Sequence, residues 1–381
     1  MESNKRIKKL LIVVNVDWFF LSHRLPIAQR ALKEGWDVYL AAQDTGKSET
    51  IKKHGVKFIN IPLSRSGTSL LEEFKTIKFF FKVYNKVKPD IVHHVTMKPV
   101  IYGSLVSKIT KVKGTLNAIS GMGYNFTSQR KSLVQRVMLK LMKIGFNQEN
   151  LAFVFQNNDD FLETKNLRVL GKDNEVFFIK GSGVDLKVFN KSELIKKEKI
   201  NILFPARMLW DKGVLELIKA SETLKDKYKN KVVFILAGLA DDNNKAGVNE
   251  KYLKDNEVKG YLEWVGYQEN MIEVYKKSDI VVLPSYREGM PKSLIEACAI
   301  GRPIVTTEAV GCKECVDEGI NGFKVPVKSI KELARAIEKL ILSEELRESM
   351  GNNSRVKAEN EFSIESVVDK HLDIYKTLYE K

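Results

Sequence analysis

The sequence predicts an α/β protein with two doubly wound parallel sheets, and two observations support this prediction. The chain has 381 residues, which is too long for one typical core and suits two domains of about 150–200 residues each. Short apolar runs also alternate with amphipathic stretches along the whole chain. Because strands that alternate with helices form parallel sheets, we expect each half of the chain to build one.

In the first half, six apolar runs predict strands at residues 9–14, 38–42, 57–61, 91–94, 114–118 and 151–155. Amphipathic stretches between them, such as 26–34 and 72–87, predict helices. The second half repeats the pattern, with strands predicted at residues 200–205, 232–237, 261–265, 280–284 and 303–306. Ligands of such sheets bind outside the carboxyl ends of the strands, so motifs at strand ends carry the most weight.

A lysine- and glutamate-rich stretch at 190–199 marks the predicted domain boundary. We therefore expect a first domain at 1–190, a second at 191–362 and a C-terminal helix within 363–381. The apolar face of this helix comprises Ile364, Val367, Val368, His371, Ile374 and Leu378. We expect the helix to cross back and pack on the first domain.

The charge of the chain is uneven. Residues 1–190 contain 31 Lys and Arg against 16 Asp and Glu, whereas residues 191–381 contain 32 of each kind, so the net charge of +15 belongs to the first half. Such asymmetry indicates an anionic partner, which can be nucleic acid, a membrane surface or a phosphorylated substrate. A merely solvated lysine-rich surface is the alternative. No nucleic-acid recognition motif is present, and we expect no nucleic-acid partner.

No stretch approaches the roughly 18 apolar residues that a membrane span requires, so we expect a cytoplasmic protein that is soluble or peripheral on the membrane.

Three cysteines, Cys298, Cys312 and Cys315, lie close together in the sequence. The last two form a CxxC, but no second pair completes a zinc site. Reduced, buried side chains are the favoured interpretation, and thiol redox chemistry is the alternative.

A strand followed by a loop and a helix is predicted around residues 280–303, with Glu288 in the loop and Gly289 allowing a ligand close to the backbone. Pro291 fits the helix start and Gly301 its end. A helix N-terminus favours phosphate, so Glu288 is better placed to accept hydrogen bonds from sugar hydroxyls. Glu296, one turn inside the helix, can bind a ribose. The alternative for Glu288 is a charge that complements the helix dipole. The alternative for Glu296 is a solvated helix residue.

Arg207 and Lys212 follow the strand predicted at 200–205. Two cations at a strand end can neutralise the diphosphate of a nucleotide sugar without a metal ion. No Asp-x-Asp motif is present. The adjacent pairs Asp159-Asp160 and Asp241-Asp242 are interpreted as a helix start and a polar loop. We therefore expect neither a metal nor a cofactor, with the nucleotide sugar as a substrate.

These motifs, together with Pro284-Ser285, Gly301-x-Pro303, Asn321-Gly322 and Gly181-Ser-Gly-Val-Asp185, resemble the retaining family 4 glycosyltransferases. The resemblance implies a GT-B fold, in which two Rossmann-like domains face a cleft. It implies that Glu288 contacts the donor sugar, Glu296 the ribose, and Arg207 and Lys212 the diphosphate, with Glu288, Arg207 and Lys212 as catalytic residues. The other donor-binding residues that it implies are Gly266, Gly289, Met290, Pro291 and Lys292.

The first half resembles a narrower group, the bacillosaminyl-diphospho-undecaprenol N-acetylgalactosaminyltransferases and their capsule and O-antigen relatives. The marks are residues 17–26, Thr96-Met-Lys98 and Ser120-Gly-Met-Gly-Tyr124. Many relatives carry a histidine where this chain has Ser120. The acceptor-side candidates are His23, Arg24, His94, Thr96, Lys98, Gly121, Gly123 and Tyr124.

The resemblance implies transfer, with retention, of an N-acetylhexosamine from UDP-GalNAc or UDP-GlcNAc to an undecaprenyl-diphosphate-linked sugar. Such a reaction belongs to the assembly of bacterial surface glycans or glycoprotein glycans, at the inner face of the plasma membrane. A nucleotide-sugar 2-epimerase of the same fold is the alternative enzyme, and a nucleic-acid-binding protein the non-enzymatic one. A dehydrogenase is disfavoured because no GxGxxG follows the first strand.

Residues 129–146 predict an amphipathic helix, and its packing bears on whether an anionic membrane surface is the partner of the first half. Its apolar stripe comprises Leu133, Val134, Val137, Met138, Leu141 and Ile144, and its cations are Arg130, Lys131, Arg136, Lys140 and Lys143. Packing of the stripe on the core of the first sheet is one interpretation. Contact of the helix with an anionic membrane surface is the other.

Overall fold

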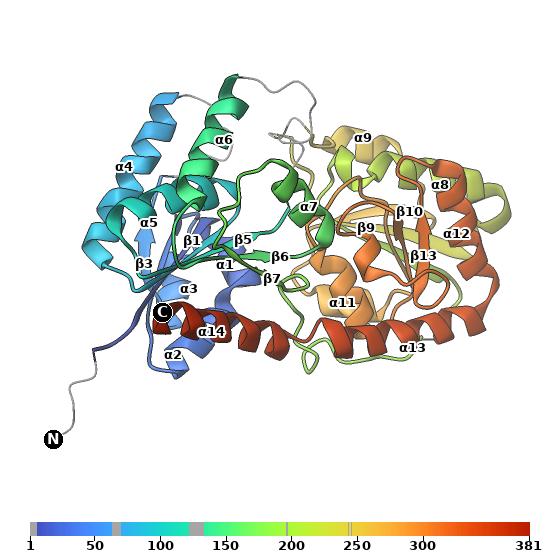
Figure 1. Ribbon diagram of the computed structural model, residues 1–381. Helices are drawn as coiled ribbons and strands as arrows, with labels where there is room; N and C mark the ends of the chain where they lie inside the picture. Colours follow the sequence, from blue (N-terminus) through green and yellow to red (C-terminus); the bar gives the residue numbers. More distant parts are fainter. Residues whose placement is uncertain (1–5, 63–69, 122–132, 196, 243, 245) are drawn as a thin grey trace. The chain divides into compact units, whose positions relative to one another are not determined.

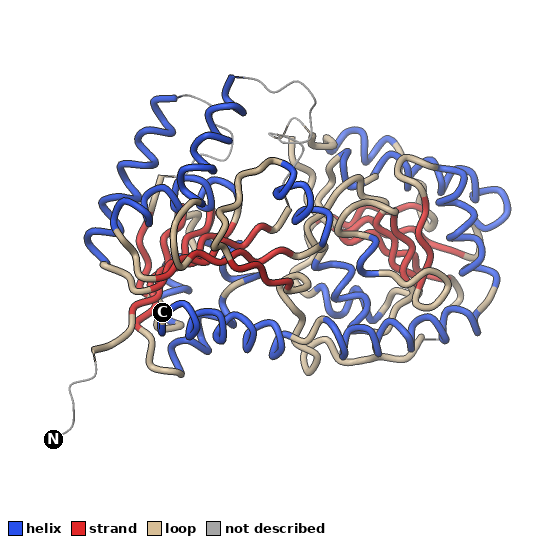
Figure 2. Tube along the Cα trace, in the orientation of Figure 1, coloured by secondary structure: helices blue, strands red, loops and turns tan. Residues whose placement is uncertain are grey.

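The computed structural model describes residues 6–62, 70–121, 133–195, 197–242, 244 and 246–381. The chain divides into two compact units. Unit 1 comprises Met1–Ser182 with Glu365–Lys381, and unit 2 comprises Gly183–Ile364. Each unit contains one parallel sheet covered by helices (Figures 1 and 2). The predicted α/β class with two parallel sheets is confirmed.

The sheet of unit 1 has the strand order β3-β2-β1-β4-β5-β6-β7. Its strands are β1 (Lys9–Val16), β2 (Asp37–Gln43), β3 (Lys57–Asn60), β4 (Ile91–Val95), β5 (Gly114–Ile119), β6 (Leu151–Phe155) and β7 (Glu175–Phe178). The chain builds outward from β1 to β3 and then returns to place β4 on the other side of β1. The strand order therefore reverses between β1 and β4, which is where open parallel sheets bind ligands.

Helices cover both faces of this sheet, with α4 and α6 on one side and α2 and α14 on the other (Figure 1). The bounds are α1 (Asp17–His23), α2 (Leu25–Lys33), α3 (Ser48–Lys53), α4 (Leu70–Val87), the π-helix η1 (Pro99–Gly103), α5 (Ser104–Thr110), α6 (Leu133–Phe146), α7 (Asn158–Asn166) and α14 (Ile364–Glu380). The C-terminal helix α14 returns to unit 1, as expected. Its Tyr375 hydroxyl lies 2.7 Å from His93 Nδ1 of β4, and Tyr375 also packs edge-to-face on Trp36.

The sheet of unit 2 has the order β10-β9-β8-β11-β12-β13. Its strands are β8 (Ile200–Pro205), β9 (Val232–Ala237), β10 (Leu262–Gly266), β11 (Ile280–Leu283), β12 (Ile304–Thr307) and β13 (Gly322–Val325). Its helices are η3 (Trp210–Lys212), α8 (Val214–Tyr228), α9 (Glu250–Asp255), α10 (Met271–Lys276), α11 (Lys292–Ile300), η4 (Lys313–Cys315), α12 (Ile330–Leu342) and α13 (Glu344–Glu361).

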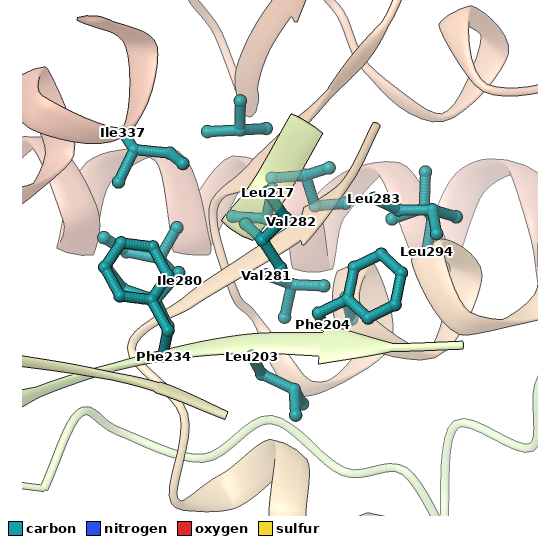
Figure 3. Close-up of a cluster of buried hydrophobic side chains, with 14 of the residues drawn as sticks. Leu203, Phe204, Leu217, Phe234, Ile280, Val281, Val282, Leu283, Leu294 and Ile337 are labelled. Carbon is teal, nitrogen blue, oxygen red and sulfur yellow. The ribbon is translucent and has the colours of Figure 1, made fainter. Parts of the chain in front are cut away.

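Unit 2 is held together by apolar side chains of its central strands. Val281 and Val282 of β11 are fully buried, and Leu217 of α8, Leu294 of α11 and Ile337 of α12 gather around the same cluster (Figure 3). Burial of side chains of this size stabilises the fold by about 1.5–3 kcal/mol each. The strands that carry the candidate site are therefore rigidly placed.

The predicted helix at residues 129–146 is α6 in the part that the structure describes. Only part of its predicted stripe faces the core. Met138 and Leu141 pack against the core together with Leu139, Met142 and Phe146, because α6 packs on α5. Val134, Val137 and Ile144 are exposed by 42%, 39% and 52%. The interpretation that the whole stripe packs on the core is thus wrong for these three residues. Arg130 and Lys131 lie outside the described residues.

Among the described residues, no helix combines the length and the apolar character that crossing a bilayer requires.

Candidate functional site

The donor-site motifs of unit 2 come together where its strand order reverses. Strands β8 and β11 are neighbours, with Ile202 opposite Ile280, although they lie far apart in the sequence. Arg207 and Lys212 follow β8, and Glu288 follows β11. The sheet therefore places the predicted cations and the predicted carboxylate at the carboxyl ends of adjacent strands, the usual position of a ligand.

Glu288 and Lys212 form an ion pair between Oε1 and Nζ. The two side chains are only 13% and 21% exposed, and the Ser285 hydroxyl donates to the same Oε1 at 2.7 Å. A carboxylate held by a lysine and a hydroxyl is fixed in orientation. Because a carboxylate accepts hydrogen bonds and donates none, this arrangement suits a ligand that brings hydroxyl groups.

The backbone of this loop is pinned by close contacts that only glycine permits. Gly213 has φ +82°, and a Cβ there would clash with the Pro284 carbonyl oxygen. A Cβ on Gly311 would meet the carbonyl oxygens of Glu288 and Gly289 at 2.5 Å. The Glu288 amide donates to the Val310 carbonyl at 2.9 Å. The position of Glu288 is therefore fixed from both sides by backbone that a side chain would displace.

Helix α11 begins beside this loop and ends as predicted. Pro291 is its N-cap residue rather than its first helical residue, and Gly301 closes it in the left-handed conformation. The Pro291 side chain makes no capping hydrogen bond, which leaves the helix dipole available to an anion. Met290 is 8% exposed, and its sulfur lies 3.4 Å from Cys315 Sγ. Its side chain therefore belongs to the core, and Met290 can contact a sugar donor only through its backbone.

Glu296 lies one turn inside α11 and is not a solvated surface residue. Its side chain is 13% exposed, with Oε1 3.6 Å from Lys292 Nζ. Burial raises the pKa of Glu296 above its usual value, against the opposing influence of Lys292 and Tyr275. A sheltered carboxylate beside Lys292 and Tyr275 can still accept hydrogen bonds from a diol such as a ribose.

Arg207 and Gly266 lie on the same edge of the sheet. Arg207 is half-exposed, and its ion-pair partner among the described residues is Asp241, at 3.5 Å, a weak surface pair. Gly266 ends β10 with φ +65° and open space around its α-carbon. Its carbonyl accepts from the Gly238 amide at 2.8 Å. The arginine can therefore turn toward an anion at little cost.

The acceptor-side candidates of unit 1 separate into interior and accessible groups. Arg24 is 2% exposed and His94 is fully buried. His94 lies between the Tyr84 hydroxyl, at 2.6 Å, and Asn117 Oδ1, at 2.7 Å. Both side chains are interior groups that reach a ligand only through their neighbours. His23 is more accessible and stacks on Phe19 with ring centroids 4.2 Å apart.

Three further candidates lie at strand ends. Thr96 follows β4 with φ +72°, and Gly121 follows β5 with φ +108°. Lys98 forms an ion pair of 2.9 Å with Glu73 of α4. Gly123 and Tyr124 lie outside the described residues.

Sequence reasoning missed two residues that support Glu288. Ser285 was not recognised as its hydrogen-bond partner, although Pro284-Ser285 is part of the motif. Gly311 was not recognised at all, because its close approach to the Glu288 backbone is visible only in the fold.

The three cysteines are buried and free. Burial raises the pKa of Cys298 and of Cys312 to about 12, so neither thiol is a nucleophile at neutral pH. No group of side chains in the described part of the chain has the composition of a metal site.

Two family descriptions match the chain. Residues 9–157 match "Glycosyl transferase 4-like" and residues 187–357 match "Glycosyl transferases group 1". The chain is 29% identical over 380 residues to the N,N'-diacetylbacillosaminyl-diphospho-undecaprenol alpha-1,3-N-acetylgalactosaminyltransferase of Campylobacter jejuni, with 93% of this chain and 97% of the relative covered. It is 25% identical to the UDP-Gal:alpha-D-GlcNAc-diphosphoundecaprenol alpha-1,3-galactosyltransferase of Escherichia coli, with 90% and 89% covered.

Solved structures share the fold over nearly the whole chain. A glycosyltransferase from Rickettsia africae superposes with a TM-score of 0.76 at 20% identity, covering 98% of this chain and 99% of that one. Anabaena Alr3699/HepE, solved in complex with UDP and glucose, superposes with a TM-score of 0.77 at 15% identity, covering 97% and 100%.

Proposed function

Because this chain is a glycosyltransferase of GT-B fold, with a glycosyl transferase 4-like first half and a group 1 second half, we propose that it glycosylates a polyprenyl-diphosphate-linked sugar. We propose a UDP-N-acetylhexosamine, UDP-GalNAc or UDP-GlcNAc, as its donor. The names of the Campylobacter and Escherichia relatives both contain a sugar linked to undecaprenyl diphosphate, which supports the acceptor. The Campylobacter name gives N-acetylgalactosamine as the transferred sugar, and the Escherichia name gives a UDP-sugar, UDP-Gal, as the donor. The observation that carries the proposal is the Lys212–Glu288 pair at the strand-order reversal of unit 2.

The proposed roles of the donor-site residues follow from their charges. Lys212 and Arg207 stabilise the negative charge that grows on the departing UDP. Glu288 accepts hydrogen bonds from the hydroxyls of the transferred sugar, and Glu296 from those of the ribose. Such a site supplies positioning and charge stabilisation. We propose retention of the anomeric configuration, with the leaving phosphate oxygen accepting the proton of the acceptor hydroxyl on the same face of the sugar.

The test is a screen of UDP-sugars against short-chain polyprenyl-diphosphate sugars, with the product anomer assigned by NMR. Transfer of an N-acetylhexosamine with retained configuration is the expected result. Turnover of UDP-sugar to a 2-epimer in the absence of acceptor would instead establish the alternative enzyme class. An inverted product would overturn the proposed mechanism while leaving the glycosyltransferase assignment intact.

A peripheral contact of unit 1 with anionic membrane is part of this proposal, since a polyprenyl acceptor stays in the bilayer. Helices α4 and α6 both pack on α5 and both expose apolar side chains beside cations. On α4 these are Phe74, exposed by 73%, and Phe81, exposed by 41%, with Lys75, Lys78 and Lys82 exposed beside them. On α6 they are Val134, Val137 and Ile144, with Arg136, Lys140 and Lys143. Each cation near anionic lipid contributes on the order of 1 kcal/mol.

We expect the full chain to sediment with phosphatidylglycerol vesicles, weakly with phosphatidylcholine vesicles, and less as salt rises. Phe74→Ser with Phe81→Ser should weaken this binding. Phe178→Ser is the matched control, because Phe178 is 48% exposed but lies on β7. Equal loss in the control, or binding that ignores salt and lipid charge, would show that α4 and α6 do not form the contact.

A further inference from the structure

A side-chain hydrogen bond between Tyr286 and Glu216 joins the two segments that carry the donor-site residues. Tyr286 lies in the loop after β11, two residues before Glu288. Glu216 lies in the first turn of α8, four residues after Lys212. The Tyr286 hydroxyl donates to Glu216 Oε1 at 2.6 Å. This bond therefore links the chain beside Glu288 to the chain beside Lys212.

The backbone of the same two segments is joined at the Asp211 carbonyl group. The Tyr286 amide donates to this oxygen at 2.8 Å, and the Ser285 hydroxyl donates to it at 3.1 Å. The Tyr286–Glu216 bond adds a second attachment, made at the far end of a long side chain. A loop attached at two separate points does not rotate about either of them. One residue separates Tyr286 from Glu288, so these attachments also restrict where the Glu288 carboxylate lies.

Glu216 is an unfavourable residue for stability at this position. Its side chain belongs to a residue that is only 5% exposed, and its Oε2 is buried without a hydrogen-bond partner among the described residues. No lysine or arginine in the described part of the chain forms an ion pair with it. The N-terminus of α8 favours an acidic side chain, but a buried carboxylate with one hydrogen bond still costs free energy. An apolar side chain would pack there at lower cost, so we look for the role of Glu216 in what it holds.

The aromatic ring of Tyr286 is also contacted on its face. Lys328, which follows β13, places Nζ 4.9 Å from the centroid of this ring. A cation above an aromatic face is attracted to it, although weakly where the lysine is exposed. The hydroxyl and the ring face of Tyr286 are therefore held by different elements, α8 and the segment after β13.

We propose that Tyr286 and Glu216 are positioning residues, which hold the Glu288 carboxylate opposite Lys212 and thereby set the rate of transfer. The consequence for the rate rests on the proposed function. Neither side chain has to touch the donor in this role. A displacement of about 1 Å in a catalytic group lowers the rate strongly. Loss of the Tyr286–Glu216 bond should therefore lower kcat more than it weakens nucleotide binding.

The test compares three variants of the full chain with the wild type. Glu216→Leu with Tyr286→Phe removes both partners of the bond, so neither side chain keeps an unpaired polar atom. Glu216→Gln keeps a carbonyl oxygen that accepts from the Tyr286 hydroxyl. The matched control is Glu338→Leu with Tyr228→Phe, because the Tyr228 hydroxyl donates to Glu338 Oε1 at 2.9 Å and Tyr228 is the last residue of α8. UDP release gives kcat, calorimetry gives the affinity for UDP, and thermal unfolding reports the fold.

We expect Glu216→Leu with Tyr286→Phe to lower kcat about tenfold to a hundredfold. The affinity for UDP should change less than about threefold, because UDP lacks the sugar that Glu288 is proposed to contact. The melting temperature should hold or rise, because both partners of a buried polar pair have become apolar. Glu216→Gln should keep kcat within about threefold of the wild type, and the control should leave kcat unchanged.

Four results would overturn the inference. The first is an unchanged kcat when both partners are removed. The second is an equal loss of kcat in Glu216→Gln, which would show that the hydrogen bond is not the cause. The third is an equal loss in the control, which would show that any such change on α8 has this effect. The fourth is an equal loss of UDP affinity, which would assign the pair to nucleotide binding.

A measurement without turnover separates this inference from the proposed function. Glu288→Gln and Lys212→Ala should couple in thermal unfolding, because their ion pair exists in the free protein. When Tyr286 and Glu216 are replaced as above, this coupling should fall by about half or more, whereas it should persist in the control. Loss of the coupling without transfer from any UDP-sugar would support the positioning role and refute the proposed function. Transfer with undiminished coupling would support the proposed function and overturn the inference.

Discussion

Replacing Glu288 by glutamine should remove most activity and little stability. The glutamine side chain keeps a carbonyl oxygen in place of Oε1, so Ser285 still donates to it and Lys212 still contacts it, but the negative charge opposite the ammonium is lost. The two side chains of the wild-type pair are partly sheltered, at 13% and 21% exposure. The loss should therefore lie between that of a surface pair and that of a buried one, about 1–2 kcal/mol. Unit 2 spans Gly183–Ile364, and for a unit of this size the melting temperature should fall by about 2–8 °C.

The effect on transfer should be larger. A hydrogen bond to a charged group contributes about 1.5–3 kcal/mol, and the amide of the variant cannot replace it. The value of kcat/KM should therefore fall by about tenfold to two-hundredfold, measured by UDP release with saturating acceptor. Retention of more than about a tenth of the wild-type kcat/KM in a folded variant would refute the role of Glu288.

A double-mutant cycle combines Glu288→Gln with Lys212→Ala. It distinguishes the energy of the ion pair between the two residues from the role of each residue in binding the ligand. In thermal unfolding the two substitutions should couple, because the ion pair exists in the free protein. In kcat/KM they should also be non-additive, since a site that has lost one of its two charges has little activity left to lose. Additive effects in both measurements would show that the pair is incidental.

The same site and the buried histidines of unit 1 allow three shorter predictions. Arg207→Ala and Lys212→Ala should each lower kcat at saturating donor, because the charge on the leaving diphosphate grows in the transition state; a rise in the donor KM alone would contradict this. A chelator should leave the wild-type rate unchanged, and a loss of activity that Mg²⁺ or Mn²⁺ restores would refute the metal-free scheme. Acidification should destabilise unit 1, which contains all five histidines of the chain. Burial lowers the pKa of His94 to about 4 and that of His371 to about 3. The unfolded chain protonates them near pH 6.5, so stability is full above this pH and falls below it, by up to about 1.4 kcal/mol per pH unit for each histidine. Thermal unfolding of the chain and of His371→Gln between pH 7 and pH 5 measures this, and equal slopes for both would contradict it.

The strands were largely predictable because their apolar runs are local. All eleven predicted strands are present, three of them with the predicted bounds and the others with ends that shift by one or two residues. The two that sequence reasoning missed, β7 and β13, are four-residue edge strands. An edge strand has a neighbouring strand on one side only, so it does not require a continuous apolar run. Helix α1 was missed because β1 passes into it directly, without a side chain that caps it.

The hydrogen bonds of Asp17, the first residue of α1, are contacts that no local sequence pattern predicts. Asp17 is fully buried and accepts hydrogen bonds from the Thr45 amide at 2.6 Å and the Lys47 amide at 3.0 Å. These partners lie in the connection after β2 and are neighbours only because β1 and β2 pair. The sequence around Asp17 indicates a motif, but the loop that it holds becomes visible only in the fold.

The same limit applies to the side chains at the strand ends of the two sheets. Sequence reasoning found Glu288, Lys212 and Arg207 because each stands in a recognisable strand–loop–helix context, and the fold added that two of them pair across the strand-order reversal. The side-chain oxygen of Asn15 carries no such signal, because asparagine at a strand end is an ordinary turn residue. What distinguishes it is that folding buries this oxygen without a partner among the described residues, which costs about 1–3 kcal/mol. Only the fold shows that such a group lies where the strand order of the first sheet reverses, so this edge of the sheet could not be predicted from the sequence.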